Sequence, residues 1–480
     1  MAKLVLYPRL APQDRIRLWL GAFDETQKRL VSWTLNGVPA VPETLREFDS
    51  ARPEGMHDGN EARAFTGVYE FVGLDPSTTY DVTAHCGGES VSRRVATLPT
   101  DIPAEGRGWF NILLVSCFHK TEAEAGVMER VIARIEREMK PSMTLLMGDQ
   151  VYLDLPTLRV FKNDKKWLAK KFEQDYISNW GGPSGMAAAL AVAPSVAMPD
   201  DHEYWNNFPH ASPFVRISLS KSGRDNWRAA SQALYEGFQL HRPGQLGDAV
   251  ELDVGPLSLY VADTRSLRNK AGDDHRIFTD DGLRDVLRWC AELGPRKKHG
   301  LFVTGQSMFA GPASWVGGTV ADKELSNYAD CKQVVRALAD NERDLICITG
   351  DVHWGRFVRS RDPHAERNIY EVITSPSALV TSVGSDQVAN TRNFLRGLFG
   401  RRKAWPRHSD APVPESYWHQ RWLGNRFRSE RTRAIKGDQV AVLSFCRAGQ
   451  RVLARVTWYP IHSRTASPIR TAPFPMPRKP

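Results

Sequence analysis

The sequence predicts a fold in two parts, a small β-sandwich followed by a larger layered α/β domain. Its 480 residues exceed the usual size of one domain, so two domains are the first expectation. Up to about residue 100, short stretches of alternating apolar and polar residues are separated by turns with glycine or proline, which is typical of a β-sandwich. From residue 110 onward, apolar runs alternate with amphipathic helical patterns, which predicts buried strands covered by helices.

The N-terminal region contains four clear strand patterns: RIRLWLGAF (15–23), GVYEFVGL (67–74), YDVTAHC (80–86) and ESVSRRVATL (89–98). Within VGLDPSTTYDVTA (72–84), Leu74, Pro76 and Tyr80 resemble the tyrosine-corner segment of fibronectin type III-like domains. We therefore expect an N-terminal β-sandwich domain over residues 1–100. A linker is expected at 101–109, where proline and glycine recur.

The α/β region contains six apolar runs that fit buried strands: WFNILLVS (109–116), MTLLM (143–147), SVAM (195–198), LSLYVA (257–262), GLFVT (300–304) and LICIT (345–349). Helical patterns separate several of them, at 124–139, 281–293 and 328–340. Residues 438–460 resemble an antiparallel hairpin that turns at Arg447-Ala448-Gly449. We expect this domain to cover 110–460, followed by an irregular tail at 461–480 that is rich in proline and arginine.

Ionisable side chains follow most of these apolar runs. In chain order they are Cys117 and His119, Asp149 and Tyr152, Asp200 to Glu203, Asp263 and Arg265, and Asp351 and His353. In open α/β sheets, functional groups gather beyond the carboxyl ends of the strands. So many ionisable groups would be costly if they were buried without partners. Metal ions would remove that cost, so the pattern predicts a metal centre in a shared crevice.

The types of side chain narrow the choice of metal. Carboxylates, imidazole and a phenol suit hard ions, whereas a structural zinc site would show clustered cysteines and histidines. A phenolate fits a trivalent cation best, because a strong Lewis acid lowers the pKa of the phenol. A second site made of Asp and Asn oxygens would accept a divalent ion such as Ca²⁺. Asp149 follows Gly148 at the tightest turn, and it is the natural carboxylate to bridge the two ions.

Four motifs in this order resemble one known family: GDQVYLD (148–154), PDDHEYWNN (199–207), DTRS (263–266) and GDVHW (350–354). They are similar to the motifs of alkaline phosphatase D-type (PhoD-like) enzymes of the calcineurin-like metallophosphatase superfamily. The resemblance spans about residues 110–380. It implies a metallophosphatase-type layered β-sandwich flanked by helices, preceded by a small all-β domain of fibronectin type III or immunoglobulin type. Cys117 and Tyr152 stand where the general superfamily carries aspartates, as in the alkaline phosphatase D variant.

The resemblance also implies a binuclear metal centre. Fe³⁺ would be held by Cys117, Asp149, Tyr152 and His353, and Ca²⁺ by Asp149, Asp201 and Asp351. Asn207 is expected to contribute to the calcium site, and His119 is either an extra ligand or a neighbour of the ligands. Other divalent ions would also fit these oxygen-rich sites.

Two further residues receive catalytic roles from the resemblance. His202 occupies the place of the superfamily's catalytic histidine, which protonates the leaving oxygen or steadies the transition state. Arg265 matches the arginine that clamps substrate phosphate, a task for which its planar fork is suited. Asp200 is expected to orient His202, and Glu203 to act as a structural acceptor. Hydroxide formed at the metals would attack phosphorus in line, without a covalent phosphoenzyme.

The sequence therefore predicts a metal-dependent phosphoesterase that acts on phosphate monoesters or diesters. The alternative is a catalytically degenerate metallophosphatase fold that binds a partner through its N-terminal β-domain. A weaker alternative is nucleic-acid binding by three basic runs, at 162–171, 396–403 and 426–433. No nucleic-acid recognition motif accompanies these runs, so we interpret them as solvated faces and expect no stable nucleic-acid partner.

Composition limits the remaining classes of ligand, cellular location and membrane association. The net charge is +9, which favours acidic ligands, although the basic residues are dispersed. The six cysteines form no CxxC pair and are expected to be mostly reduced core residues. No apolar stretch reaches the roughly 18 residues of a transmembrane helix. The start is too short in apolar residues for a signal peptide, so a cytoplasmic location is expected unless a leader was removed. The oligomeric state is not indicated.

Overall fold

A computed structural model describes most of the chain. The described residues are 4–120, 123, 125–156, 160–240, 246–269, 275–308, 325–351, 355–362, 367–378, 428–435, 437–461 and 467–476. His353 and the basic run at 396–403 lie outside them, as do the side chains of the run at 426–433.

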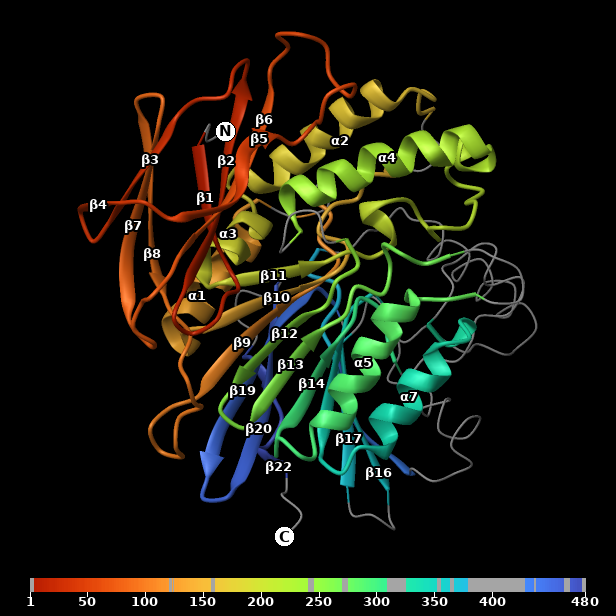
Figure 1. The fold of residues 1–480 in the computed structure, drawn as a ribbon. Helices are drawn as coiled ribbons and strands as arrows, with labels where there is room; N and C mark the ends of the chain where they lie inside the picture. The colour runs from red at the N-terminus through yellow and green to blue at the C-terminus, as the bar shows by residue number, and fades with distance from the viewer. Residues whose placement is uncertain are drawn as a thin grey trace.

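Two large sheets form the centre of the molecule (Figure 1). The first runs in the order β21 (Ile469–Arg470), β20 (Arg451–Pro460), β19 (Gln439–Ala448), β9 (Phe110–Val115), β10 (Met143–Met147), β11 (Ser195–Met198), β1 (Leu4–Arg9), β2 (Ile16–Glu25), β6 (Arg63–Phe71) and β5 (Glu43–Ser50), with β22 (Phe474–Met476) beside β20. The second runs in the order β12 (Val250–Val254), β13 (Leu257–Val261), β14 (His299–Val303), β15 (Leu345–Thr349), β17 (Arg367–Ile373), β16 (Gly355–Asp362) and β18 (Arg428–Ile435).

The strands that lead to the predicted site are parallel within each sheet. β9, β10 and β11 are parallel neighbours in the first sheet, and so are β13, β14 and β15 in the second. Alternate residues of each strand point to opposite faces. Ile112 and Leu114 of β9 enter the core between the two sheets, whereas Leu113 and Val115 face the helices. Both faces are buried, which explains the continuous apolar runs in the sequence.

Helices cover the outer faces of both sheets. On the first sheet lie α1 (Val127–Met139), α2 (Lys165–Trp180), α3 (Gly185–Val192) and α4 (Lys221–Phe238). On the second lie α5 (Asp280–Glu292) and α7 (Cys331–Asp340). Short 3₁₀ turns occur at η1 (Asp201–Glu203), η2 (Arg216–Leu219) and η3 (Leu325–Asn327). The fold is therefore the predicted layered β-sandwich flanked by helices.

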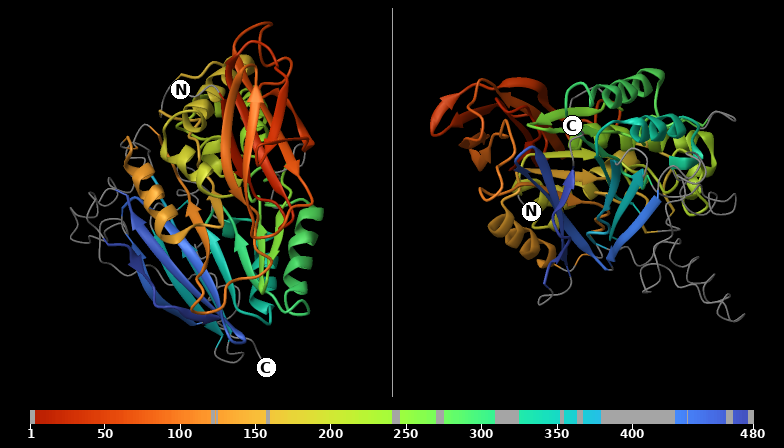
Figure 2. Two further views of the ribbon diagram at one scale, coloured as in Figure 1. Left: turned by 90° about the vertical axis from the view of Figure 1, so that its left-hand side faces the viewer. Right: turned by 90° about the horizontal axis from the view of Figure 1, so that it is seen from below.

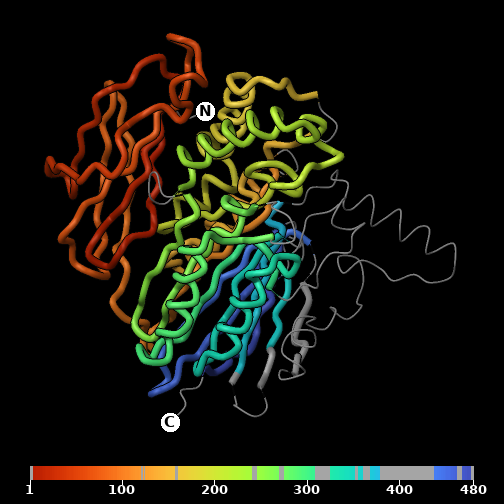
Figure 3. The backbone as a smooth tube through the Cα atoms, turned by 45° about the vertical axis from the view of Figure 1, so that its right-hand side comes forward, coloured from red at the N-terminus to blue at the C-terminus, as the bar shows by residue number. Residues whose placement is uncertain are grey.

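The N-terminal strands form a smaller sandwich at one end of the molecule (Figures 2 and 3). A separate sheet of β4 (Val38–Ala40), β3 (Val31–Leu35), β7 (Thr79–Cys86) and β8 (Glu89–Ala96) packs on β1, β2, β5 and β6. The hydroxyl of Tyr80 accepts a hydrogen bond from the backbone N–H of Asp75 at 3.0 Å, the contact of a tyrosine corner. Strand β1 also pairs with β11, so one sheet continues from the small sandwich into the larger domain. The proposed boundaries at residues 100 and 110 remain a prediction.

The C-terminal hairpin has the predicted position, with β19 and β20 joined through Gly449 and Gln450. The expectation of an irregular tail is wrong in part. Ile469–Arg470 and Phe474–Met476 pair with β20 as short strands, because Phe474 and Met476 reach the apolar core between the sheets. All six cysteines are buried and free of disulfides, as expected.

Candidate active site

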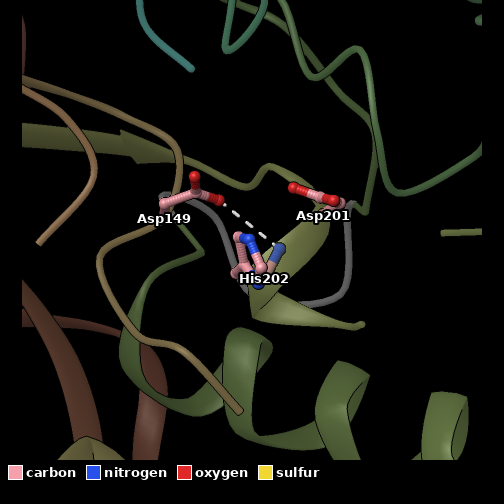
Figure 4. Close-up of side chains that lie close together, drawn as sticks. All are labelled: Asp149, Asp201 and His202. Carbon is pink, nitrogen blue, oxygen red and sulfur yellow. Dashed lines mark hydrogen bonds between the residues drawn. The ribbon is translucent and has the colours of Figure 1, made fainter. Parts of the chain in front are cut away.

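The carboxyl ends of β9, β10, β11 and β15 bring the predicted metal ligands together. Two groups of side chains have ligand atoms that all lie within 4.8 Å of one another: Asp149, Asp201 and His202, and Asp149, Asp200 and Asp351. Figure 4 shows Asp149 and Asp201 on either side of His202. Asp149 belongs to both groups, which is the geometry that a bridging carboxylate requires.

The backbone at this site is held in an unusual conformation. Cys117, Asp149, Asn207 and Asp351 have positive φ values of 54°, 57°, 68° and 64°. Such values cost free energy in residues other than glycine, and they persist where function and surrounding contacts hold them. Gly148 has a φ of +78°, and a Cβ there would lie 2.5 Å from Cβ of Asp200. The glycine before Asp149 is thus needed for both the turn and the close approach of two loops.

Donor groups converge on the Asp149 carboxylate. Its Oδ2 lies 3.3 Å from the Cys117 Sγ and 3.5 Å from the Tyr152 hydroxyl, and both groups donate to it. The backbone N–H of His202 donates to Oδ1 at 3.4 Å. Cys117 and Tyr152, which were predicted to bind one metal together with Asp149 and His353, therefore meet at Oδ2 of Asp149.

Burial and like charges act on the ionisation of this cluster. Burial raises the pKa of Asp149, with further increases from the charges of Asp201 and Asp200, while His202 acts in the opposite sense. Burial likewise raises the pKa of the Cys117 thiol and of the Tyr152 phenol, and nearby carboxylates add to the effect. A bound cation would reverse these shifts by stabilising the anionic forms. The donor set therefore fits metal ions.

Glu203 acts as the predicted structural acceptor. Its Oε2 accepts the backbone N–H groups of Asp149 at 2.9 Å and of Asp200 at 2.8 Å. Its Oε1 accepts those of Gln150 at 2.6 Å and of Val151 at 3.4 Å. One buried carboxylate thus joins the loop after β10 to the loop after β11.

Asp154 has a role that the sequence did not assign. Its Oδ1 lies 2.8 Å from Nδ1 of His202, and its Oδ2 accepts the backbone N–H of Asn206 at 2.8 Å. The expectation that Asp200 orients His202 is wrong, because Asp154 holds that position. In the sequence, the only sign of this role was that a second carboxylate, Asp154, ends the motif GDQVYLD.

Asp200 is instead the partner of Arg265. The Arg265 Nε donates to Oδ1 of Asp200 at 2.6 Å, and its Nη1 donates to the carbonyl of Phe208 at 2.9 Å. The Arg265 side chain is fully buried. Its predicted role as a phosphate clamp would require a guanidinium that is free to meet the substrate, and that role remains a prediction.

The remaining candidates lie at the edge of the cluster. The His119 ring packs against the Tyr152 ring at a centroid distance of 5.3 Å. The backbone N–H of Asn207 donates to Oδ2 of Asp201 at 2.8 Å. Gln306, after β14, donates to Oδ2 of Asp351 at 3.3 Å and was not predicted. His353 cannot be placed, since it lies outside the described residues.

Comparison with known proteins decides the family. A family model described as PhoD-like phosphatase matches residues 112–397, which is more than half of the chain. The chain belongs to the PhoD-like phosphatase family. This assignment confirms the resemblance carried by the four motifs. No curated protein matches the sequence.

One solved structure supports the fold of this PhoD-like phosphatase family member. The structure of PhoD matches with 15% identity and a TM-score of 0.61, over 98% of this chain and 89% of that chain. At this identity the match shows the fold alone. A dimetal phosphatase from Danio rerio matches with 10% identity and a TM-score of 0.33, over 72% of this chain and 95% of that one. The GAP50 anchor in the inner membrane complex of Plasmodium matches with 8% identity and a TM-score of 0.39, over 78% and 90%.

None of the described helices is both long and apolar enough to cross a membrane.

Proposed function

We propose that this protein is a metal-dependent phosphoesterase that hydrolyses phosphate esters. The observation that carries the proposal is the pair of ligand groups that share Asp149 at the carboxyl ends of the strands. Membership of the PhoD-like phosphatase family supports the same chemistry. The described residues supply the thiol, the phenol and the carboxylates that the metal centre needs, and the sequence adds the imidazole of His353, which favours an enzyme over a degenerate scaffold.

We propose Fe³⁺ and Ca²⁺ as the metals. Cys117, Asp149 and Tyr152 would hold Fe³⁺, because a phenolate and a thiolate gain most from a strong Lewis acid. Asp149, Asp201 and Asp351 would hold Ca²⁺, which prefers oxygen ligands. The proximity of Asp200 to Asp351 supports it as a further acidic neighbour of the second ion. Bound metal ions would lower the pKa of a water molecule and neutralise charge on the phosphoryl oxygens.

The residues of the chain would then carry the proton transfer and the positioning. His202 would donate its proton to the leaving ester oxygen, and Asp154 would hold the imidazole through Nδ1 in the orientation that this requires. Glu203 would fix the backbone on which Asp149 and Asp200 stand. The contacts of Arg265 support a role in positioning Asp200, beside the proposed clamp on the phosphate.

The test is to measure hydrolysis of p-nitrophenyl phosphate and of bis(p-nitrophenyl) phosphate, with Fe³⁺ and Ca²⁺ present. We expect turnover of at least one of them, and loss of turnover and of bound metal in Asp149→Asn. Glu136→Gln, an exposed change on α1, should retain both and serves as the control. No turnover of either ester by the metal-loaded protein would contradict the proposal and favour the scaffold function.

The metal assignment has its own readout. A phenolate and a thiolate bound to Fe³⁺ both absorb visible light, so the purified protein should be coloured. Tyr152→Phe should weaken and shift the visible band, because the Cys117 thiolate remains, while iron stays measurable by elemental analysis. A colourless, iron-free protein that hydrolyses either ester would contradict the assignment of iron but not the hydrolase.

A further inference from the structure

A second cavity lies between the N-terminal end of α5, the residues before β12 and the end of β13, and it shares no lining residue with the two metal-ligand groups. Its volume is about 570 Å³, within the usual range for small-molecule sites. The lining residues that matter here are four aspartates and two aromatic residues: Asp248, Asp263, Asp281, Asp285, Tyr260 and Phe278. None of the groups of side chains close enough to chelate a metal falls in this cavity, as far as the described residues show.

The charge of the cavity is opposite to that of the protein. The chain carries a net charge of +9, yet the described lining contains four aspartates and no lysine, arginine or histidine. Asp281 and Asp285 are partly neutralised on their own helix, by Arg284 and by Arg288. The charge of Arg268, which does not line the cavity, acts on Asp263. Asp248 is exposed and has no ion-pair partner within the described part of the chain. Negative charge therefore remains at the cavity.

The buried end of the cavity contains an incompletely satisfied carboxylate. Asp263 is only 7% exposed. Its Oδ1 accepts the backbone N–H groups of Arg265 at 3.0 Å and Ser266 at 2.8 Å. Its Oδ2 has no hydrogen-bond partner among the described residues. A buried carboxylate oxygen without a donor is costly, so this atom indicates where a ligand donor would bind.

The composition of the cavity also indicates the class of ligand. Tyr260 and Phe278, although mostly buried, line the cavity with Leu246 and Leu267 beside the carboxylates. Aromatic rings and carboxylates together attract organic cations. Oδ2 of Asp263 can accept a hydrogen bond, which a protonated amine donates together with its positive charge and which a quaternary ammonium ion cannot donate.

Within the described lining, the N-terminus of α5 is the feature that would favour an anion. It is already occupied, because the Thr279 side chain accepts the N–H of Gly282 at 3.1 Å and Asp280 and Asp281 lie in its first turn. We propose that the cavity binds a small protonated aliphatic amine, with its ammonium group on Asp263 and Asp248 at the entrance. The proposal does not rest on the proposed ester hydrolysis.

The experiment is a calorimetric titration of the full chain with butylamine at neutral pH, where the amine is protonated. We expect saturable binding of butylamine, weaker binding of tetramethylammonium, and none of butanol. Asp263→Asn should weaken binding about 10- to 100-fold, the effect of losing one charge-assisted hydrogen bond. Asp225→Asn, an exposed change on α4, should leave the affinity unchanged.

Other variants keep the proposal testable if Asp263→Asn does not fold. Asp248→Asn should weaken binding of butylamine, and Ala249→Trp, which fills the cavity, should abolish it. Equal binding of butanol and butylamine, or unchanged affinity in Asp248→Asn and Ala249→Trp, would overturn the proposal. If Ca²⁺ alone binds with the same affinity as butylamine and displaces it, the cavity is a metal-ion site and the assignment to an amine is wrong.

Discussion

At the scale of single residues, Glu203 connects the two loops that carry Asp149 and Asp200. Both of its oxygens accept backbone N–H groups, and the side chain is fully buried. In Glu203→Gln the amide NH₂ would face N–H donors, so two backbone groups would lose their acceptor. We expect a loss of about 2 to 4 kcal/mol in the free energy of unfolding, measured in urea, together with a large fall in esterase activity.

Glu136→Gln provides a matched control for this change, since Glu136 is exposed on α1 and should tolerate the amide with both properties unchanged. An unaltered unfolding curve and full activity in Glu203→Gln would show that the four backbone contacts do not hold the site.

His202 and Asp154 form the second residue-scale prediction. If Asp154 orients His202 as the donor of a proton to the leaving oxygen, Asp154→Asn should lower kcat more for esters with poor leaving groups. We expect a loss of about 10-fold or more with phenyl phosphate and a smaller loss with 2,4-dinitrophenyl phosphate. Metal content, measured by elemental analysis, should remain that of the unmodified protein. An equal loss with both esters would assign Asp154 to structure alone.

The sequence predicted the residues that meet at the site better than it predicted their pairings. Asp149, Asp201 and Asp351 follow buried strands, and parallel strands of one sandwich end at the same edge, so their convergence was predictable. The partner of His202 was not predictable, because Asp200 lies two residues from it in the same motif whereas Asp154 lies 48 residues away in another motif. Which carboxylate reaches Nδ1 depends on how two loops cross, and spacing along the chain carries no such information.

At the scale of elements, the strands that lead to the site were easier to predict than β12, β16 and β17 or several of the helices. The six apolar runs became β9, β10, β11, β13, β14 and β15, and the three predicted helices became α1, α5 and α7. α2, α3 and α4 were not predicted. α2 buries Leu168 and Phe172 but also Glu173 and Asn179, because it packs against both α4 and the N-terminal strands. A helix buried on several sides loses the one-sided periodicity that reveals it.

The basic run at 162–171 is explained by the same packing. Lys166 forms an ion pair with Asp58 at 2.5 Å, and Lys170 forms one with Glu61 at 2.9 Å. Both ion pairs join α2 to the loop before β6. This supports the interpretation of the run as a protein surface rather than a nucleic-acid site.

Glu173 on α2 yields a prediction about pH. It pairs with Arg52 at 2.8 Å and accepts the N–H of Ala64, while burial raises its pKa from 4.5 to about 7 against the opposing effect of Arg52. The folded protein thus binds this proton more tightly than the unfolded chain. The contribution of Glu173 to the free energy of unfolding is fully present below pH 4.5, falls as the pH rises, and is lost above pH 7.

Glu173→Gln should remove this dependence. Relative to the variant, the unmodified protein should lose about 3 kcal/mol of unfolding free energy between pH 4.5 and 8. Urea unfolding at several pH values measures the difference, with Glu138→Gln on α1 as an exposed control. Parallel pH curves for the unmodified protein and Glu173→Gln would contradict the prediction.

At the scale of the whole molecule, the small N-terminal sandwich is joined to the larger domain by more than a linker. Strand β1 pairs with β11 at Arg9 and Ser195, and the indole N–H of Trp19 donates to the carbonyl of Gly237 at 2.7 Å. The composition change near residue 100 indicated a boundary in the sequence, but a sheet that continues across it depends on pairing between residues far apart in the chain. Sequence patterns report local periodicity, so they could not predict this junction.

The junction predicts how the protein unfolds. Trp19 and Phe23 pack on Phe238, which belongs to the same apolar cluster as Tyr176 and Trp180. Removing residues 1–98 would expose these aromatic faces and leave an edge of β11 unpaired. We expect the full chain to unfold in urea as one transition, with the same midpoint by circular dichroism and by tryptophan fluorescence. The 99–480 fragment should aggregate or unfold without cooperativity. The prediction fails if the full chain unfolds in two separate transitions, or if the fragment is soluble and has full esterase activity. Either result would show that the two parts fold independently.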